Sequence, residues 1–336
     1  MSTAIDAGLV ERFSAALDRL NPGGARIGLA VSGGPDSMAM LLLAHAAIPG
    51  GFEVATVDHG LRPEAADECA LVVAACEARN VPCQVLSVDV SRGNVQSRAR
   101  RARYNALGQW ASRRGLAAVA TAHHADDQAE TLLMRLNRAS GIDGLAGIRE
   151  RLEMPYDGFG QGTAFWLIRP LLGFRRSELI SVVDGAGQAF VSDPSNVDDS
   201  YDRVRMRKVL SQADWLDPSG VAASASHLAD ALDALNHAFW PLYNTHVRRR
   251  EHHGEVDVWL SLPEDTPRYF LFQAVDTSLR SVGGDPRGGD VARLLERLLC
   301  GEGGNVAGVL VTVEGGGWYF RREPTRRAQS AAMRQR

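Results

Sequence analysis

Residues 27 to 37 place the strongest constraint on the fold of this chain. An apolar run suited to one buried strand ends in Ser-Gly-Gly at residues 32 to 34, and Pro35 then leads into an apolar segment of helical length, residues 38 to 47. The pattern predicts a strand, a tight turn and a helix that begins near Gly34 or Pro35, because proline fits the first helical turn, where its missing N–H would have had no partner. Unpaired N–H groups and the positive end of the helix dipole make such a junction favourable for phosphate.

Asp36 stands where the phosphate groups would lie. The segment contains neither the Gly-Lys-Ser/Thr of a Walker A loop nor the G-x-G-x-x-G of dinucleotide-binding folds. Two interpretations are open. In the first, Asp36 only complements the dipole of an ordinary helix. In the second, phosphate binds and a cation offsets the repulsion, for which Mg²⁺ is the hard, oxygen-preferring choice.

Strand-like and helix-like segments alternate up to about residue 140. We expect strands at about 27–31, 52–57, 83–90 and 116–122, and helices at about 1–20, 36–47, 64–79, 95–114 and 126–138. This order predicts an α/β fold with a doubly wound, mostly parallel sheet. Ligands bind beyond the carboxyl ends of the strands in such sheets, and three polar segments follow strands there: 32–37, 58–62 and 123–130.

Beyond residue 140 the pattern loosens. A hairpin with a strand at 165–168, a helix at about 175–183 and a basic helical segment at 203–210 are expected. The sequence Asp-Pro-Ser-Gly at residues 217 to 220 is typical of a linker.

A second, smaller α+β domain is expected after this linker. Residues 221–253 predict one or two helices that Pro241 kinks or divides, followed by a strand, two helices and two strands up to about Arg322. We therefore predict a first domain at 1–216, a second domain at 221–322 and a basic, disordered tail at 323–336.

Composition excludes several classes of protein. A hydrophobic content of 45% with 23% charged residues is ordinary for a globular chain, and no apolar run has membrane-spanning length, so we expect a cytoplasmic protein without a signal peptide or membrane partner. The four cysteines form no C-x-x-C pair, which argues against a zinc ribbon or the usual iron–sulfur spacings. Cys69 and Cys76 are expected to face the core.

Local basic patches stand out against a formal net charge of −3. Seven arginines and no acid lie between Ser91 and Arg114, so a nucleic acid partner would be bound locally. Arg100 and Arg103 would share one side of a helix, where they could be a solvated face or bind phosphate in a bidentate manner.

Residues 123 to 131 combine two histidines with three carboxylates. Asp127 and Glu130 are one helical turn apart and are expected to point the same way. The cluster is open to three interpretations: a metal site of the His/Asp kind, a carboxylate pair that captures a cationic substrate or accepts its proton, or an acid-rich first helical turn.

These motifs together resemble the tRNA isoleucine lysidine synthetases, a family within the PP-loop or N-type ATP pyrophosphatase superfamily. The resemblance covers about residues 25 to 210 and rests on six segments: 32–37 (SGGPDS), 57–62 (VDHGLR), 99–104 (ARRARY), 120–131 (ATAHHADDQAET), 169–172 (RPLL) and 193–196 (DPSN). It implies that residues 1–216 are a catalytic, adenine nucleotide alpha hydrolase-like PP-loop domain and that residues 221–322 are the family's substrate (tRNA)-binding domain. Two positions depart from the family pattern, because Val204 follows Arg203 where an asparagine is usual and Ser192 replaces an acidic residue; they leave the local role of residues 192–207 in question.

The resemblance also implies a reaction. The family uses ATP and Mg²⁺ to adenylate C2 of the wobble cytidine in an isoleucine tRNA with a CAU anticodon, and free L-lysine then displaces AMP. Carried over to this chain, the ATP-binding residues would be Ser32, Gly33, Gly34, Pro35, Asp36, Ser37, Asp58, His59 and His123, with Asp36 as the Mg²⁺ ligand. Asp127 and Glu130 would bind lysine, and the catalytic set would be Asp36, Arg100, Arg103, Asp127 and Glu130.

Two rival functions are considered. A PP-loop tRNA cytidine thiolase would need sulfur-handling or cluster-binding cysteines, which the spacing here does not provide. A catalytically inactive tRNA-binding module would gain nothing from carboxylates near phosphate. The oligomeric state is not fixed by the sequence, and a homodimer is one option.

Overall fold

A parallel sheet forms the centre of the first of two units in the chain. The computed structural model describes residues 5–60, 64–88, 95–156, 163–191, 202–252 and 254–323. The chain divides into units 1–232 and 233–336, and the division falls within the long helix α9 (Pro218–His246).

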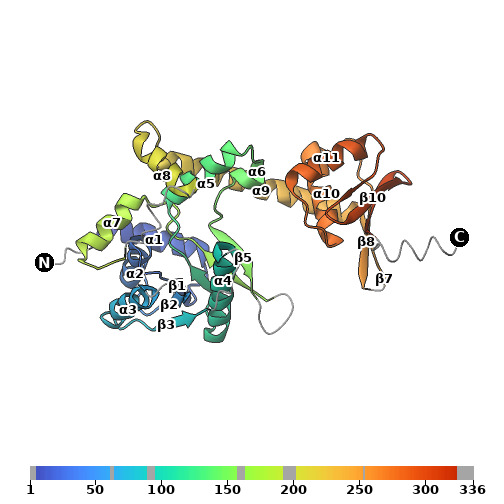
Figure 1. Ribbon diagram of the computed structural model, residues 1–336. Coiled ribbons are helices and arrows are strands. Elements are labelled where there is room, and N and C mark those ends of the chain that lie inside the picture. The colour runs from blue at the N-terminus through green and yellow to red at the C-terminus, as the bar shows by residue number, and fades with distance from the viewer. Residues whose placement is uncertain are drawn as a thin grey trace. The chain divides into compact units, whose positions relative to one another are not determined.

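The first unit alternates strands and helices as expected (Figure 1). Its strands are β1 (Ile27–Ala30), β2 (Phe52–Asp58), β3 (Cys83–Ser87), β4 (Ala118–Ala120), β5 (Arg151–Pro155) and β6 (Ala164–Ile168). Its helices before α9 are α1 (Ala7–Leu20), α2 (Pro35–Ala47), α3 (Glu64–Glu77), α4 (Val95–Arg114), α5 (Ala125–Asn137), α6 (Ile142–Leu145), α7 (Arg176–Gly185) and α8 (Asp202–Gln212).

The strand order of this sheet is β3-β2-β1-β4-β6-β5. All neighbouring pairs are parallel except β5 and β6, so the predicted doubly wound, mostly parallel sheet is confirmed. The chain adds strands on one side of β1 up to β3 and then crosses to the other side for β4. The carboxyl ends of β1 and β4 therefore form a topological switch point, which is where such sheets bind ligands.

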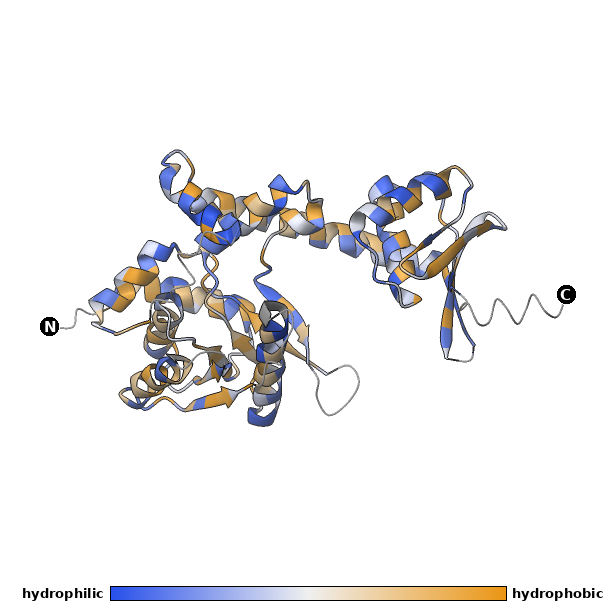
Figure 2. Cartoon of the chain, viewed as in Figure 1, coloured by the Kyte–Doolittle hydropathy of each residue, from blue (hydrophilic) through white to orange (hydrophobic). Residues whose placement is uncertain are grey.

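The two faces of the sheet are covered by different helices. Ile27 and Leu29 belong to one cluster with α1, α2, α3 and α7, whereas α4 covers the opposite face around Trp110. Gly28 allows the close approach of α4, because a Cβ there would lie 2.4 Å from Cζ3 of Trp110. In Figure 2 the central strands are mostly orange and much of α4 is blue, which agrees with strands buried on both faces beneath a helix whose outer side is solvated.

The second unit is a five-stranded antiparallel sheet with two helices. Its elements after α9 are β7 (Val247–His252), β8 (Glu255–Leu260), α10 (Arg268–Ser281), α11 (Gly288–Leu299), β9 (Gly304–Val306), β10 (Val309–Glu314) and β11 (Gly317–Arg322). The strand order is β7-β8-β11-β10-β9, and α10 and α11 share a core with the sheet. The predicted α+β class is confirmed.

Three expectations for this part of the chain are wrong. Residues 247–252 form strand β7 and not the end of a helix, because their pairing with β8 comes from backbone hydrogen bonds that the arginine-rich sequence does not reveal. A third strand, β9, pairs with β10. The supposed linker at 217–220 starts α9: the Asp217 carboxylate accepts from the N–H groups of Ser219 and Gly220, which is an N-cap.

Pro241 lies inside α9 without dividing it. Cys69 and Cys76 are buried, as expected. Among the helices that the structure describes, none has the length and hydropathy needed to cross a bilayer.

Candidate functional site

The turn between β1 and α2 has the conformation expected of an anion cradle at a helix N-terminus. Gly34 is the N-cap of α2 and Pro35 its first residue, so the predicted helix start is confirmed. Gly33 has a φ of 81°, a left-handed conformation that glycine adopts without strain. The Ser37 hydroxyl donates to the Gly34 carbonyl oxygen at 2.9 Å and accepts from Ser32 N at 3.1 Å, which closes the turn on itself.

A cavity of about 500 Å³ opens at the carboxyl ends of β1, β2 and β4. It is bordered by the β1–α2 turn on one side, by the start of α5 on another, and by one arginine each from α4 and α8. Eight of the predicted site residues line it: Ser32, Gly34, Asp36, Ser37, His59, Arg103, His123 and Asp127. The remaining predicted residues, Gly33, Pro35, Asp58, Arg100 and Glu130, do not line it.

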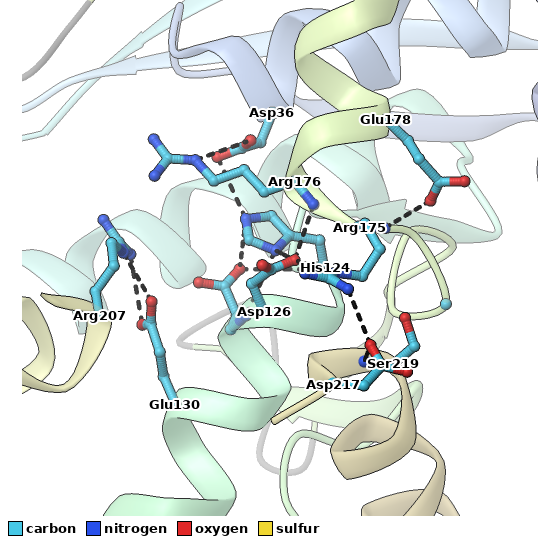
Figure 3. Close-up of polar contacts among 12 residues, drawn as sticks. Asp36, His124, Asp126, Glu130, Arg175, Arg176, Glu178, Arg207, Asp217 and Ser219 are labelled. Carbon is cyan, nitrogen blue, oxygen red and sulfur yellow. Dashed lines mark hydrogen bonds and ion pairs between the residues drawn. The ribbon is translucent and has the colours of Figure 1, made fainter. Parts of the chain in front are cut away.

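Asp36 projects from the first turn of α2 toward His124 (Figure 3). Its Oδ2 lies 3.6 Å from His124 Nε2, and its Oδ1 is buried without a hydrogen-bond partner. The Nε of Arg176 lies 4.0 Å from Oδ1. A buried carboxylate oxygen with no donor suits a hard cation such as Mg²⁺, which takes one or two protein carboxylates and completes its shell with phosphate and water.

No group of three or more His, Cys, Asp or Glu side chains arranged for a metal occurs among the residues that the structure describes. A cation bound by Asp36 or by residues 123–130 would therefore need further oxygen ligands, such as those of a phosphate group.

His124 organises the start of α5. Its backbone N–H donates to Asp127 Oδ2 at 3.2 Å, and its Nδ1 accepts from Asp127 N at 3.4 Å, which forms a reciprocal cap. Burial lowers the pKa of His124, but Asp36, Asp127 and Asp126 together outweigh it, and the pKa is raised above its ordinary value. Figure 3 shows its ring between Asp36 and the first turn of α5.

His123 has the opposite electrostatic surroundings. Its Nδ1 lies 3.0 Å from the Thr121 hydroxyl. Burial, followed by the charges of Arg169 and Arg103, lowers the pKa of His123 to about 3. A neutral imidazole therefore faces the cavity at physiological pH.

Asp127 and Glu130 lie on α5 but line different cavities. Asp127 borders the first cavity, whereas Glu130 borders a second one of about 520 Å³ that also contains Asp126, Arg175, Arg176 and Arg207. Glu130 is 1% exposed and accepts from Arg207 Nε at 2.7 Å, and Arg203 Nε is 3.6 Å away. Burial raises the pKa of Glu130, and the two guanidinium groups offset only part of that shift.

The other predicted residues occupy less direct positions. Arg100 and Arg103 lie beside the ring of Tyr104, with guanidinium carbons 5.0 and 5.3 Å from its centroid. The Asp58 carboxylate accepts from Gly60 N at 2.8 Å and so shapes the turn that carries His59. Leu61, Arg62 and residues 192–196 lie outside the described residues.

Several polar residues of the site were missing from the sequence prediction. They are His124, Asp126, Arg175, Arg176, Arg203 and Arg207. His124 and Asp126 stand within the motif that pointed to the site, and Arg203 and Arg207 within a segment recognised only as basic. Their partners are distant in sequence: Arg207 and Glu130 are separated by 77 positions.

Comparison with known proteins shows which class of domain carries this site. Residues 9–213 match the family model of the PP-loop domain. A solved structure, U34-tRNA thiolase NcsA from Methanococcus maripaludis with its [4Fe-4S] cluster, superposes with a TM-score of 0.51 over 67% of this chain and 80% of that one. At 15% identity, this likeness concerns the fold alone.

Relatives of higher sequence identity narrow this class to one enzyme family. The tRNA(Ile)-lysidine synthase of Novosphingobium aromaticivorans is 47% identical over 324 residues, which cover 96% of each chain. The enzyme of the same name from Zymomonas mobilis is 38% identical over 312 residues and 91% of each chain. This chain therefore belongs to the tRNA(Ile)-lysidine synthase family.

Proposed function

We propose that this protein ligates lysine to C2 of the wobble cytidine in isoleucine tRNA with a CAU anticodon, at the expense of ATP. Membership of the family over nearly the whole chain supports this reaction. The observation that carries the assignment to residues is the cavity at the switch point, where the anion cradle of 32–37 faces the acidic start of α5. A tRNA-modifying ligase of this kind would work in the cytoplasm.

The first step is adenylation. The C2 oxygen of the cytidine attacks the α-phosphorus of ATP, and the bond to the β-phosphate breaks to release pyrophosphate. The backbone N–H groups of Gly33, Gly34 and Asp36, with the hydroxyls of Ser32 and Ser37, would hold the leaving pyrophosphate at the positive end of α2. Asp36 would ligate Mg²⁺, which supplies charge stabilisation for the leaving group.

Three further residues would act on the same step. Neutral His123, which lines the cavity, can donate or accept a hydrogen bond with the nucleotide without adding charge. Arg103 also lines the cavity, and Arg100 lies on the same side of α4 against Tyr104. In this proposal both arginines would neutralise negative charge on the α-phosphate or the adenylated cytidine.

The second step is aminolysis. The lysine ε-amine attacks C2, and AMP leaves with the former C2 oxygen. An ammonium with a pKa of ~10.4 must first lose a proton. Asp127 and Glu130 would both bind lysine but at different points: Asp127 lines the first cavity and would contact the ε-ammonium, whereas Glu130 lines the second cavity, is held by Arg207 and Arg203, and would contact another part of the lysine. In this assignment, Glu130 orients the lysine and Asp127 receives its proton.

The thiolase alternative has less support. Among the described cysteines, only Cys69 lines the cavity, while Cys76 is buried in the core and Cys300 is exposed in the second unit. Iron–sulfur cluster chemistry or persulfide transfer at one cysteine would give the acidic residues of α5 no role in the reaction.

The test is incorporation of labelled lysine. Purified protein with ATP and Mg²⁺ should transfer lysine to a CAU-anticodon isoleucine tRNA transcript, with one AMP and one pyrophosphate released per lysine. A transcript with a CAU anticodon on a methionine tRNA body serves as the control RNA. Sulfur transfer in place of lysine incorporation would overturn the proposal.

A further inference from the structure

Two cysteines lie at the junction of α3 and β3. Cys76 is next to the last residue of α3, and Cys83 is the first residue of β3. Cys76 belongs to the buried core cluster beneath α3, and Cys83, which is partly exposed, packs against the same cluster. The connection between them folds back on α3, because Val81 N donates to the Cys76 carbonyl oxygen at 3.0 Å. This turn brings the two side chains together.

The two thiols are hydrogen-bond partners, and they differ in reactivity. The Cys76 thiol donates to the Cys83 sulfur, which raises the pKa of Cys76, together with burial, and lowers the pKa of Cys83. The thiolate is the form of cysteine that attacks oxidants, so Cys83 is the more reactive of the two as well as the more accessible. An accessible cysteine of this kind beside a second cysteine is typical of redox-sensitive sites.

Helix α3 also contacts the anion cradle. A Cβ placed on Gly33 would lie 3.4 Å from the Glu68 carbonyl oxygen and 3.7 Å from Cγ2 of Val72, and both residues belong to α3. Glu68 and Cys69 line the first cavity. A close-packed interior has little free volume to absorb a displacement and transmits strain. Movement of α3 would therefore alter the turn at residues 32–37.

We propose that Cys76 and Cys83 are a redox-sensitive pair that hydrogen peroxide converts into a disulfide, and that this disulfide weakens binding of a nucleotide at the cradle. The Cys83 thiolate attacks one oxygen of the peroxide, which forms a sulfenic acid and releases hydroxide; this hydroxide takes up the proton that Cys83 lost. The Cys76 sulfur then attacks the Cys83 sulfur, the S–O bond breaks, and the second hydroxide leaves as water with the Cys76 proton. Two thiols and one peroxide thus give one disulfide and two water molecules.

The effect on the cradle follows from the position of the pair. A covalent bond holds two sulfurs closer than a hydrogen bond does, so its formation draws the end of α3 toward β3. Disulfides in cytosolic proteins are usually transient, and reducing thiols would reverse this one. The nucleotide part of the inference rests on the proposed function, which places ATP at the cradle.

Peptide mapping of the full chain after treatment with hydrogen peroxide tests the pairing. Trypsin cleaves after Arg79, so Cys76 and Cys83 leave on separate peptides that only a disulfide joins. The joined peptides should appear with peroxide, disappear with dithiothreitol and be absent from Cys76→Ser and Cys83→Ser. Cys300→Ser is the matched control, because this exposed cysteine lies in the second unit and its loss should leave the joined peptides unchanged.

Binding of a fluorescent ATP analogue with Mg²⁺ tests the consequence. The oxidised chain should bind the analogue at least about fivefold more weakly than the reduced chain, the lower end of the couplings usual between two sites, and dithiothreitol should restore the affinity. Cys83→Ser should bind as tightly as the reduced wild type both before and after peroxide, which also establishes that this variant is folded.

Absence of the joined peptides from the oxidised wild type would overturn the pairing. Their persistence in Cys76→Ser would do the same, because Cys69 lies on the same tryptic peptide and would then be the partner. Equal nucleotide affinities of the oxidised and reduced chains would refute the effect on the cradle. The peptide map needs no substrate, so a reduced wild type that binds no nucleotide would count against the proposed function and not against the pair.

Discussion

Replacement of Asp36 by asparagine tests the central assignment of the site. Asparagine keeps the shape of the side chain and an oxygen that His124 Nε2 can reach, so the fold should survive, although the ion pair with Arg176 is lost. The charge is lost from Oδ1, the buried oxygen that has no hydrogen-bond partner and lies 4.0 Å from Arg176 Nε. A pair of opposite unit charges 4.0 Å apart is worth about 4 kcal/mol at an effective dielectric constant of 20. A cation held at Oδ1 would lose an attraction of this order when the charge is removed.

We expect pyrophosphate release by Asp36→Asn to fall about 10²- to 10³-fold, the usual loss when one group that stabilises the transition state is removed. The dependence of the rate on Mg²⁺ concentration should shift to higher values as well. Pyrophosphate is measured with a coupled phosphatase assay in the presence of the tRNA transcript, and Asp18→Asn, on the exposed side of α1, is the control. A rate within threefold of wild type with unchanged Mg²⁺ dependence would refute the role of Asp36.

Three further predictions concern other parts of the first unit. Glu130→Ala should leave pyrophosphate release measurable but block lysine transfer, as judged by accumulation of adenylated tRNA; equal loss of both steps would contradict the assignment. Because the pKa of His123 is lowered from its ordinary 6.5 to about 3, its contribution to stability is present above pH 6.5 and is lost as the pH falls toward 3. Between pH 7 and pH 5 the free energy of unfolding, measured with urea, should fall less for His123→Asn than for wild type. Equal falls would refute the assignment of a neutral His123. Gly28→Val should lower the free energy of unfolding by about 1–3 kcal/mol or more, because its Cβ would lie 2.4 Å from Trp110, whereas Gly23→Ala, with nothing within 4 Å, should have little effect.

Local patterns in the sequence were enough to predict most of the strands and helices of the first unit. The apolar runs and their spacing predicted the strands and helices up to α5, because burial on both faces of a parallel sheet leaves continuous apolar segments. The same pattern failed at β7, whose edge position leaves its arginines exposed and whose pairing with β8 is not written in its own residues. It failed again at residues 217–220, where a turn sequence serves as the cap of a long helix.

The site was predictable only in part. The turn at 32–37 and the segment 123–130 were found from their own residue types and from the rule that strand ends meet at one edge of the sheet. The role of His124 as a cap in contact with Asp36 depends on how α5 approaches α2, and that approach is set by packing.

The sequence by itself therefore determined a turn suited to phosphate, an aspartate within that turn whose charge would repel phosphate, and a cluster of acidic residues at the same edge of the sheet. Only the tertiary structure decided that Asp127 and Glu130, one helical turn apart, would line separate cavities. The physical reason is that Glu130 is buried and paired with Arg207, a residue 77 positions away that α8 brings to it. Residue types and spacing along the chain fix which groups are available, and the packing of helices against the sheet fixes which of them meet.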